Sequence, residues 1–167
     1  MRKSGSIYLV EGEDEKKLVR TLITDMQLIR PGKVLVFNAV QQNLNSRRIV
    51  TFGEYVTVVL VFDTDCGNID ILSSNIRLLQ KQSNVHEVLC VPQVTNLEDE
   101  LLRACKIKSI RELTSSSSDA KYKRDLIRAT NLDRLLEKAG FQMNLFWAKE
   151  PCGIFSSIHN DSGRIRR

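Results

Sequence analysis

Two groups of acidic residues offer the clearest chemistry in this chain. The first, residues 11–15, reads Glu-Gly-Glu-Asp-Glu and follows the apolar run 7–10, and the second, Asp63-Thr64-Asp65, follows the apolar run 56–62. A continuous apolar, β-branched run is typical of a strand that is buried on both faces. Carboxylates brought together at strand ends repel one another unless a proton or a cation intervenes. The pattern therefore predicts an all-oxygen site of the kind that Mg²⁺ or Mn²⁺ prefers.

The elements that must position these acids alternate between strand and helix patterns. Strands are predicted at residues 7–10, 34–37, 56–62 and 85–91, the last ended by Pro92, and a final strand at 143–147. Apolar residues at helical spacing predict helices over 14–26 and 69–79 and from Asn96, and a short helix is favoured within 40–51. This rhythm predicts an α/β, Rossmann-like fold, in which a mostly parallel sheet of about four strands carries helices on both faces. Right-handed crossovers would place both acidic groups at one edge of that sheet.

Composition limits the class of protein. The chain has 167 residues and 42% hydrophobic content, which fits an ordinary globular domain. No apolar run approaches the length of a membrane-spanning helix, so we expect a cytoplasmic protein without a membrane partner. Four widely spaced cysteines and two histidines make a zinc site improbable, and the carboxylates beside Cys66 should disfavour its thiolate.

A basic region follows the acidic one. Residues 1–110 hold 14 basic and 13 acidic side chains, whereas residues 111–167 hold 11 and 7. We expect an α/β core over 1–110 and a basic, mainly helical extension over 111–167 that packs on it and ends in a frayed segment, 163–167. In the extension, Lys121, Lys123 and Arg124 are candidates for binding nucleic-acid phosphates, and a solvated helix face is the alternative. Trp147 is interpreted as a core residue.

The segments Tyr8–Glu15 and Val61–Asp65 resemble the Toprim domain of primases, topoisomerases, OLD-family nucleases and small bacterial nuclease-like proteins. The resemblance covers about residues 5–105 and suggests a compact, stand-alone Toprim protein. It implies that Glu11 serves as a general acid or base or as a metal ligand, and that Asp63 and Asp65 coordinate Mg²⁺. Residues two apart on extended backbone point the same way, so the two aspartates can face one ion.

Two other acids are open to more than one interpretation. Glu98 follows the fourth predicted strand, where some nuclease-like Toprim families carry a further metal ligand, but a first helical turn also favours an acid. Glu15 is interpreted as a helix N-terminal acid rather than a site residue.

The resemblance and the acidic groups together predict Mg²⁺- or Mn²⁺-dependent phosphodiester chemistry on DNA or RNA by a nuclease. Glu11, Asp63 and Asp65 are its expected catalytic residues, and Glu98 is a further expected ligand. One alternative is a receiver-like signalling domain with Asp63 as phosphoacceptor and Lys149 as the receiver lysine. Another is a non-catalytic nucleic-acid-binding module with the same fold.

Overall fold

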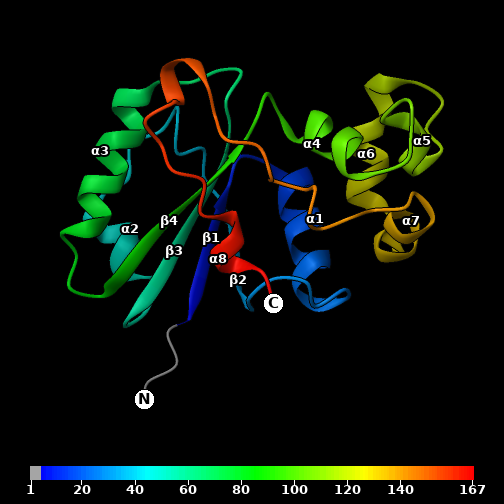
Figure 1. The fold of residues 1–167 in the computed structure, drawn as a ribbon. Coiled ribbons are helices and arrows are strands. Elements are labelled where there is room, and N and C mark those ends of the chain that lie inside the picture. Colours follow the sequence, from blue (N-terminus) through cyan, green and yellow to red (C-terminus); the bar gives the residue numbers. More distant parts are fainter. Residues whose placement is uncertain (1–4) are drawn as a thin grey trace.

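Four parallel strands form the central sheet of the computed structural model, which describes residues 5–167 (Figure 1). The strands are β1 (Ser6–Val10), β2 (Gly32–Val36), β3 (Val56–Asp63) and β4 (Val85–Gln93). They lie in the order β2-β1-β3-β4, and every neighbouring pair is parallel. The α/β class and the parallel sheet predicted from the sequence are confirmed.

Successive strand residues face opposite sides of the sheet and build two cores. Tyr8, Val59 and Val61 belong to the first core, whereas Leu9 and Leu60 belong to the second. The first face is covered by α1 (Glu13–Thr24) and α4 (Leu97–Ala104), and the second by α2 (Ser46–Val50) and α3 (Ile69–Gln80). The period of two in the strands thus places helices on both faces.

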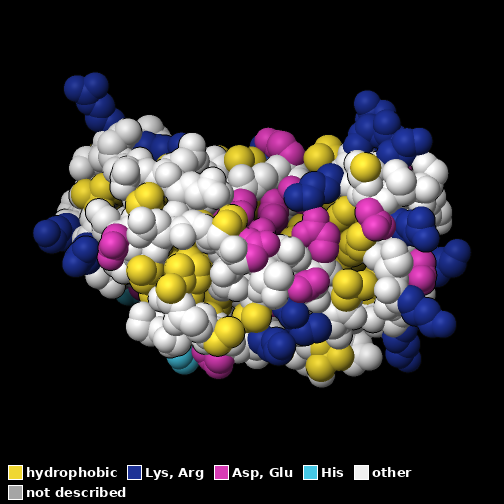
Figure 2. All heavy atoms as spheres, turned by 90° about the horizontal axis from the view of Figure 1, so that it is seen from above, with side chains coloured by type: hydrophobic (Ala, Val, Ile, Leu, Met, Phe, Trp, Pro, Cys, Tyr) yellow, Lys and Arg dark blue, Asp and Glu magenta, His cyan; other side chains and the backbone are white. Residues whose placement is uncertain are grey.

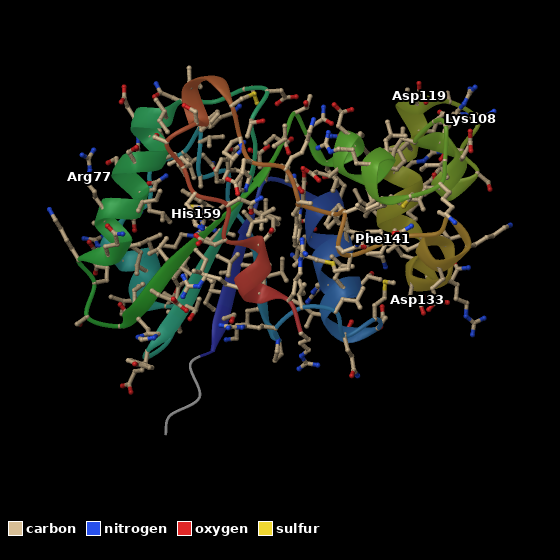
Figure 3. All side chains as sticks on the ribbon, viewed as in Figure 1. Arg77, Lys108, Asp119, Asp133, Phe141 and His159 are labelled. Carbon is tan, nitrogen blue, oxygen red and sulfur yellow. The ribbon has the colours of Figure 1, made fainter. Side chains whose placement is uncertain are left out.

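The C-terminal region adds helices beside α1 (Figure 1). They are α5 (Arg111–Thr114), α6 (Asp119–Arg128) and α7 (Leu132–Lys138). Buried leucines of all three helices join the first core, and Phe141, labelled in Figure 3, packs against Phe146 with ring centroids 5.4 Å apart. The exposed Lys108 and Asp119 lie on the side of this region away from the sheet (Figure 3). The helical character of the region agrees with expectation, and the boundary at residue 110 stays a prediction.

Three details of the sequence interpretation were wrong. Strand β4 does not end at Pro92 but continues to Gln93, since proline is tolerated on an edge strand. Residues 143–147 form turns rather than a strand, and Trp147 has a φ of +55° that a strand does not allow.

The C-terminal end is also not frayed. The chain returns over the sheet through a 3-10 turn, η1 (Gly153–Phe155), and then α8 (Ser162–Ile165). Ile165 is fully buried, its carbonyl accepts from Arg30 N at 2.8 Å, and Arg167 N donates to Leu28 O at 3.0 Å. Within residues 5–167, no helix has both the length and the apolar character that crossing a membrane requires.

Candidate metal centre

The strand order brings Glu11 and Asp63 together. The chain leaves β1 toward β2 on one side and then crosses over to β3 on the other, so the ends of β1 and β3 flank a topological switch point, where α/β folds bind ligands. Glu11 follows β1 directly, and Asp63 is the last residue of β3. The backbone N–H of Asp63 donates to Glu11 Oε1 at 3.2 Å.

A third carboxylate, Glu15, completes the cluster. One oxygen from each of Glu11, Glu15 and Asp63 lies within 4.8 Å of the other two. Glu15 reaches the cluster because it stands in the first turn of α1, on the stripe that Leu18 and Leu22 continue into the core. A Cβ on Gly12 would lie 2.9 Å from Asp14 Oδ1 and 3.1 Å from Glu15 Oε2, so glycine leaves room for these carboxylates.

Burial makes the cluster unfavourable without a cation. Burial, and then the neighbouring Asp14 carboxyl group, raise the pKa of Glu15 to about 9. Burial and then the neighbouring Glu11 raise the pKa of Asp63 to about 8, and burial also raises the pKa of Glu11. In addition, Glu15 is 4% exposed and its Oε2 has no hydrogen-bond partner among the described residues. A divalent cation would satisfy that oxygen and favour all three ionised carboxylates.

The turn after β3 is fixed to the end of β4. The backbone N–H groups of Thr64 and Asp65 donate to Thr95 O, and Thr95 N donates to Thr64 Oγ1 at 2.8 Å. Asp65 is exposed on this turn, where one of its oxygens accepts from Asn96 Nδ2 at 3.3 Å. Its charge contributes to the raised pKa of both Glu11 and Asp63, but Asp65 is not one of the three converging carboxylates and stands exposed at the rim of the cluster.

Of the predicted phosphate-binding residues, Lys123 contacts acids beside the cluster, and Glu98 is one of them. Glu98, in the first turn of α4, pairs with Lys123 at 3.4 Å, and the same ammonium lies 3.4 Å from Asp14 Oδ2. Arg124 pairs with its neighbour Asp125, and Lys121 is exposed. Figure 2 shows acidic side chains gathered in the middle of this face, with basic side chains among them and around its edges.

The sequence missed Glu15 as a member of the cluster. Its position in the first turn of α1 agrees with the predicted helix, but that position does not exclude a site role. The available signal was its spacing: Glu15 precedes Leu18 and Leu22 by three and seven residues, so it occupies a core-facing position of an amphipathic helix. An acid at such a position is rarely buried without a partner.

The cysteines carry no comparable site. All four are free, and none belongs to an acidic or histidine cluster of metal-binding geometry within residues 5–167. Desolvation and the neighbouring Asp65 raise the pKa of the Cys66 thiol to about 11, which confirms that its thiolate is disfavoured.

Comparison of the chain with models of known families gave no match, and comparisons with curated proteins and with solved structures gave none either. Fold and site together therefore define an α/β protein with a four-stranded parallel sheet and a carboxylate cluster that can hold a metal ion.

Proposed function

We propose that this chain is a Mg²⁺- or Mn²⁺-dependent nuclease of the Toprim kind. The main observation in its support is the convergence of Glu11, Glu15 and Asp63 at the switch point of the sheet. A buried oxygen of Glu15 without a hydrogen-bond partner independently supports a ligand there. The resemblance of Tyr8–Glu15 and Val61–Asp65 to Toprim segments supports the reaction class.

The residues divide the chemistry among them. A divalent ion held by the cluster would polarise a phosphoryl oxygen and lower the pKa of a water molecule. Asp63 and Glu15 would supply carboxylate oxygens to the ion, and Glu11 would act as a further ligand or as the general acid or base. We expect Asp65 and Glu98, which lie outside the three-carboxylate cluster, to bind through water or to add a ligand when substrate arrives.

A basic groove beside α1 supports a nucleic-acid substrate. Two hollows of about 450 and 270 Å³ share Lys16 and Arg20 as lining residues. Lys33 lines the first hollow and Lys17 the second, which is also lined by Glu13 from the first turn of α1. Within residues 5–167, Lys17, Arg20 and Lys33 form no ion pair with an acid, so their charges are available to phosphates.

Strand-cleavage assays on single- and double-stranded DNA and RNA test the proposal. We expect cleavage with Mg²⁺ or Mn²⁺, none with a chelator, and a loss of at least about 100-fold in Asp63→Asn. The matched control is Asp133→Asn, which removes a carboxylate on α7, away from the sheet edge (Figure 3). Nucleic-acid binding without cleavage under any of these conditions would contradict the proposal and favour a non-catalytic module.

A further inference from the structure

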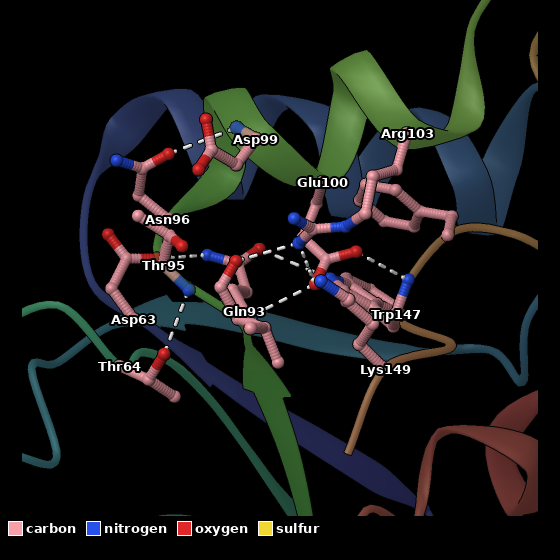
Figure 4. A network of polar contacts seen from close by, with 12 residues as sticks. Asp63, Thr64, Gln93, Thr95, Asn96, Asp99, Glu100, Arg103, Trp147 and Lys149 are labelled. Carbon is pink, nitrogen blue, oxygen red and sulfur yellow. Dashed lines mark hydrogen bonds and ion pairs between the residues drawn. The ribbon is translucent and has the colours of Figure 1, made fainter. Parts of the chain in front are cut away.

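A buried chain of hydrogen bonds lies directly behind Asp63. Gln93, the last residue of β4, is the register partner of Asp63 and has no exposed surface. Its Nε2 donates to Asp63 Oδ1 at 2.6 Å, and its Oε1 accepts from Trp147 Nε1 at 3.1 Å. Figure 4 shows Gln93 between these two partners.

The partners fix which way the Gln93 amide faces. An indole N–H can only donate a hydrogen bond, so the amide oxygen of Gln93 must face Trp147. The amide NH₂ group is then directed at Asp63, which must offer an acceptor oxygen. A buried amide with both ends engaged in this way is costly to replace by an apolar side chain, because the indole N–H would lose its acceptor.

Trp147 is itself held rigidly. Its backbone N–H donates to Glu100 Oε2 at 2.9 Å, and its carbonyl accepts from Ser162 Oγ at 2.7 Å and from Asn160 Nδ2 at 2.8 Å. Glu100 is fully buried; its Oε1 accepts from Val94 N and pairs with Arg103 at 2.8 Å (Figure 4). The chain of bonds therefore connects the returning C-terminal segment to the carboxylate cluster.

We propose that Gln93 is a positioning residue for the metal centre and that Trp147 sets its orientation. This inference rests on the proposed metal-binding function of the cluster. Gln93 occupies Oδ1 of Asp63 and leaves the second oxygen for the ion, so that the carboxylate is held in place before metal arrives. Groups that orient metal ligands in this way commonly change metal affinity by about 10- to 100-fold when they are removed.

The relay of hydrogen bonds from Trp147 through Gln93 to Asp63 is tested by calorimetric titration with Mg²⁺. The variants to compare with the wild type are Gln93→Met, Trp147→Phe and the double variant. We expect each single variant to lower the association constant, Gln93→Met by about 10- to 100-fold. The double variant should bind no more weakly than Gln93→Met, because the two residues act as one unit. Gln82→Met is the matched control: the Gln82 side chain donates to Leu78 O, far from the acidic edge, and its variant should keep wild-type affinity.

Trp147 also supplies a readout that does not depend on activity, because it is the only tryptophan in the chain. Its emission should change as Mg²⁺ binds the wild type and should not respond when Mg²⁺ saturates Gln93→Met. Circular dichroism of the metal-free variants checks folding; if Gln93→Met does not fold, Trp147→Phe alone must show weakened binding. Wild-type affinity in the folded variants, or single effects that add in the double variant, would overturn the relay alone. A wild type that binds no divalent ion would overturn the metal centre as well.

Discussion

Binding of Mg²⁺ should release protons, because the free cluster holds them at neutral pH. Glu15 has a pKa of about 9 and Asp63 of about 8, so both are largely protonated at pH 6.5. A cation requires both carboxylates in the ionised form, so each binding event should release about two protons. The logarithm of the association constant should then rise by about two for each pH unit below pH 7 and flatten above about pH 9.

Replacing Glu15 by Gln changes this number in a defined way. The variant keeps the volume of the side chain but removes one titrating group from the cluster. We expect release of about one proton or fewer, and a correspondingly shallower pH dependence. Calorimetry at pH 6.5 in two buffers of different ionisation enthalpy counts the protons directly. Glu137→Gln, an exposed glutamate on α7, is the control and should keep the wild-type number.

The refuting result is clear. Mg²⁺ binding by the wild type without proton release, or equal release by the wild type and Glu15→Gln, would place the ion away from this cluster.

Four further predictions follow from the same structure. Glu11→Gln should reduce cleavage strongly and leave the thermal stability of the metal-free protein equal or higher, because it removes a buried carboxylate whose charge raises the pKa of Asp63; a large loss of stability would indicate a structural role. Without metal, the free energy of unfolding should fall as pH rises from about 5 to about 9. The pKa values of Glu15 and Asp63 are raised in the folded state, so the folded protein binds more protons than the unfolded chain in this range. The stability that these groups contribute at low pH is therefore lost as pH rises. Urea titrations at several pH values measure this, and saturating Mg²⁺ should oppose the decline. Glu100→Ala should lower the free energy of unfolding by about 3–5 kcal/mol, because it leaves the N–H groups of Val94 and Trp147 without an acceptor and Arg103 without its paired charge. An unchanged denaturant midpoint would show that the network contributes little. Replacing three cations of the groove, Lys17, Arg20 and Lys33, by Ala should reduce the salt dependence of duplex binding. The slope of the logarithm of the binding constant against the logarithm of salt concentration should fall in magnitude by about 2.7. An equal loss in a triple variant of Lys121, Lys123 and Arg124 would show that these α6 residues also contact phosphates.

The sequence predicted the four strands of the sheet but not where β4 ends. Apolar, β-branched runs predicted all four strands. The two central strands, β1 and β3, are buried along almost their whole length, and these are the two that acids follow. Pro92 was interpreted as a strand end, although an edge strand can contain proline. That error hid Gln93, whose pairing with Asp63 requires β4 to continue one residue further.

The candidate site was likewise predictable only in part. Glu11 and Asp63 could be paired in advance, because both end parallel strands of one sheet. Glu15 joins them through the orientation of α1, which depends on how that helix packs rather than on any local motif. Trp147 lies 54 positions from Gln93, and the turns that bring it there have no signature in residue spacing.

Diffraction from crystals soaked with Mn²⁺, recorded at a wavelength that gives anomalous signal, tests the metal centre most directly. We expect an anomalous peak between the end of β1 and the end of β3, with oxygens of Glu11, Glu15 and Asp63 about 2.1 Å from the ion. Soaked Asp63→Asn crystals should lose or weaken that peak. Mn²⁺ peaks found only elsewhere on the molecule, with these three carboxylates unligated at saturating concentration, would contradict this expectation.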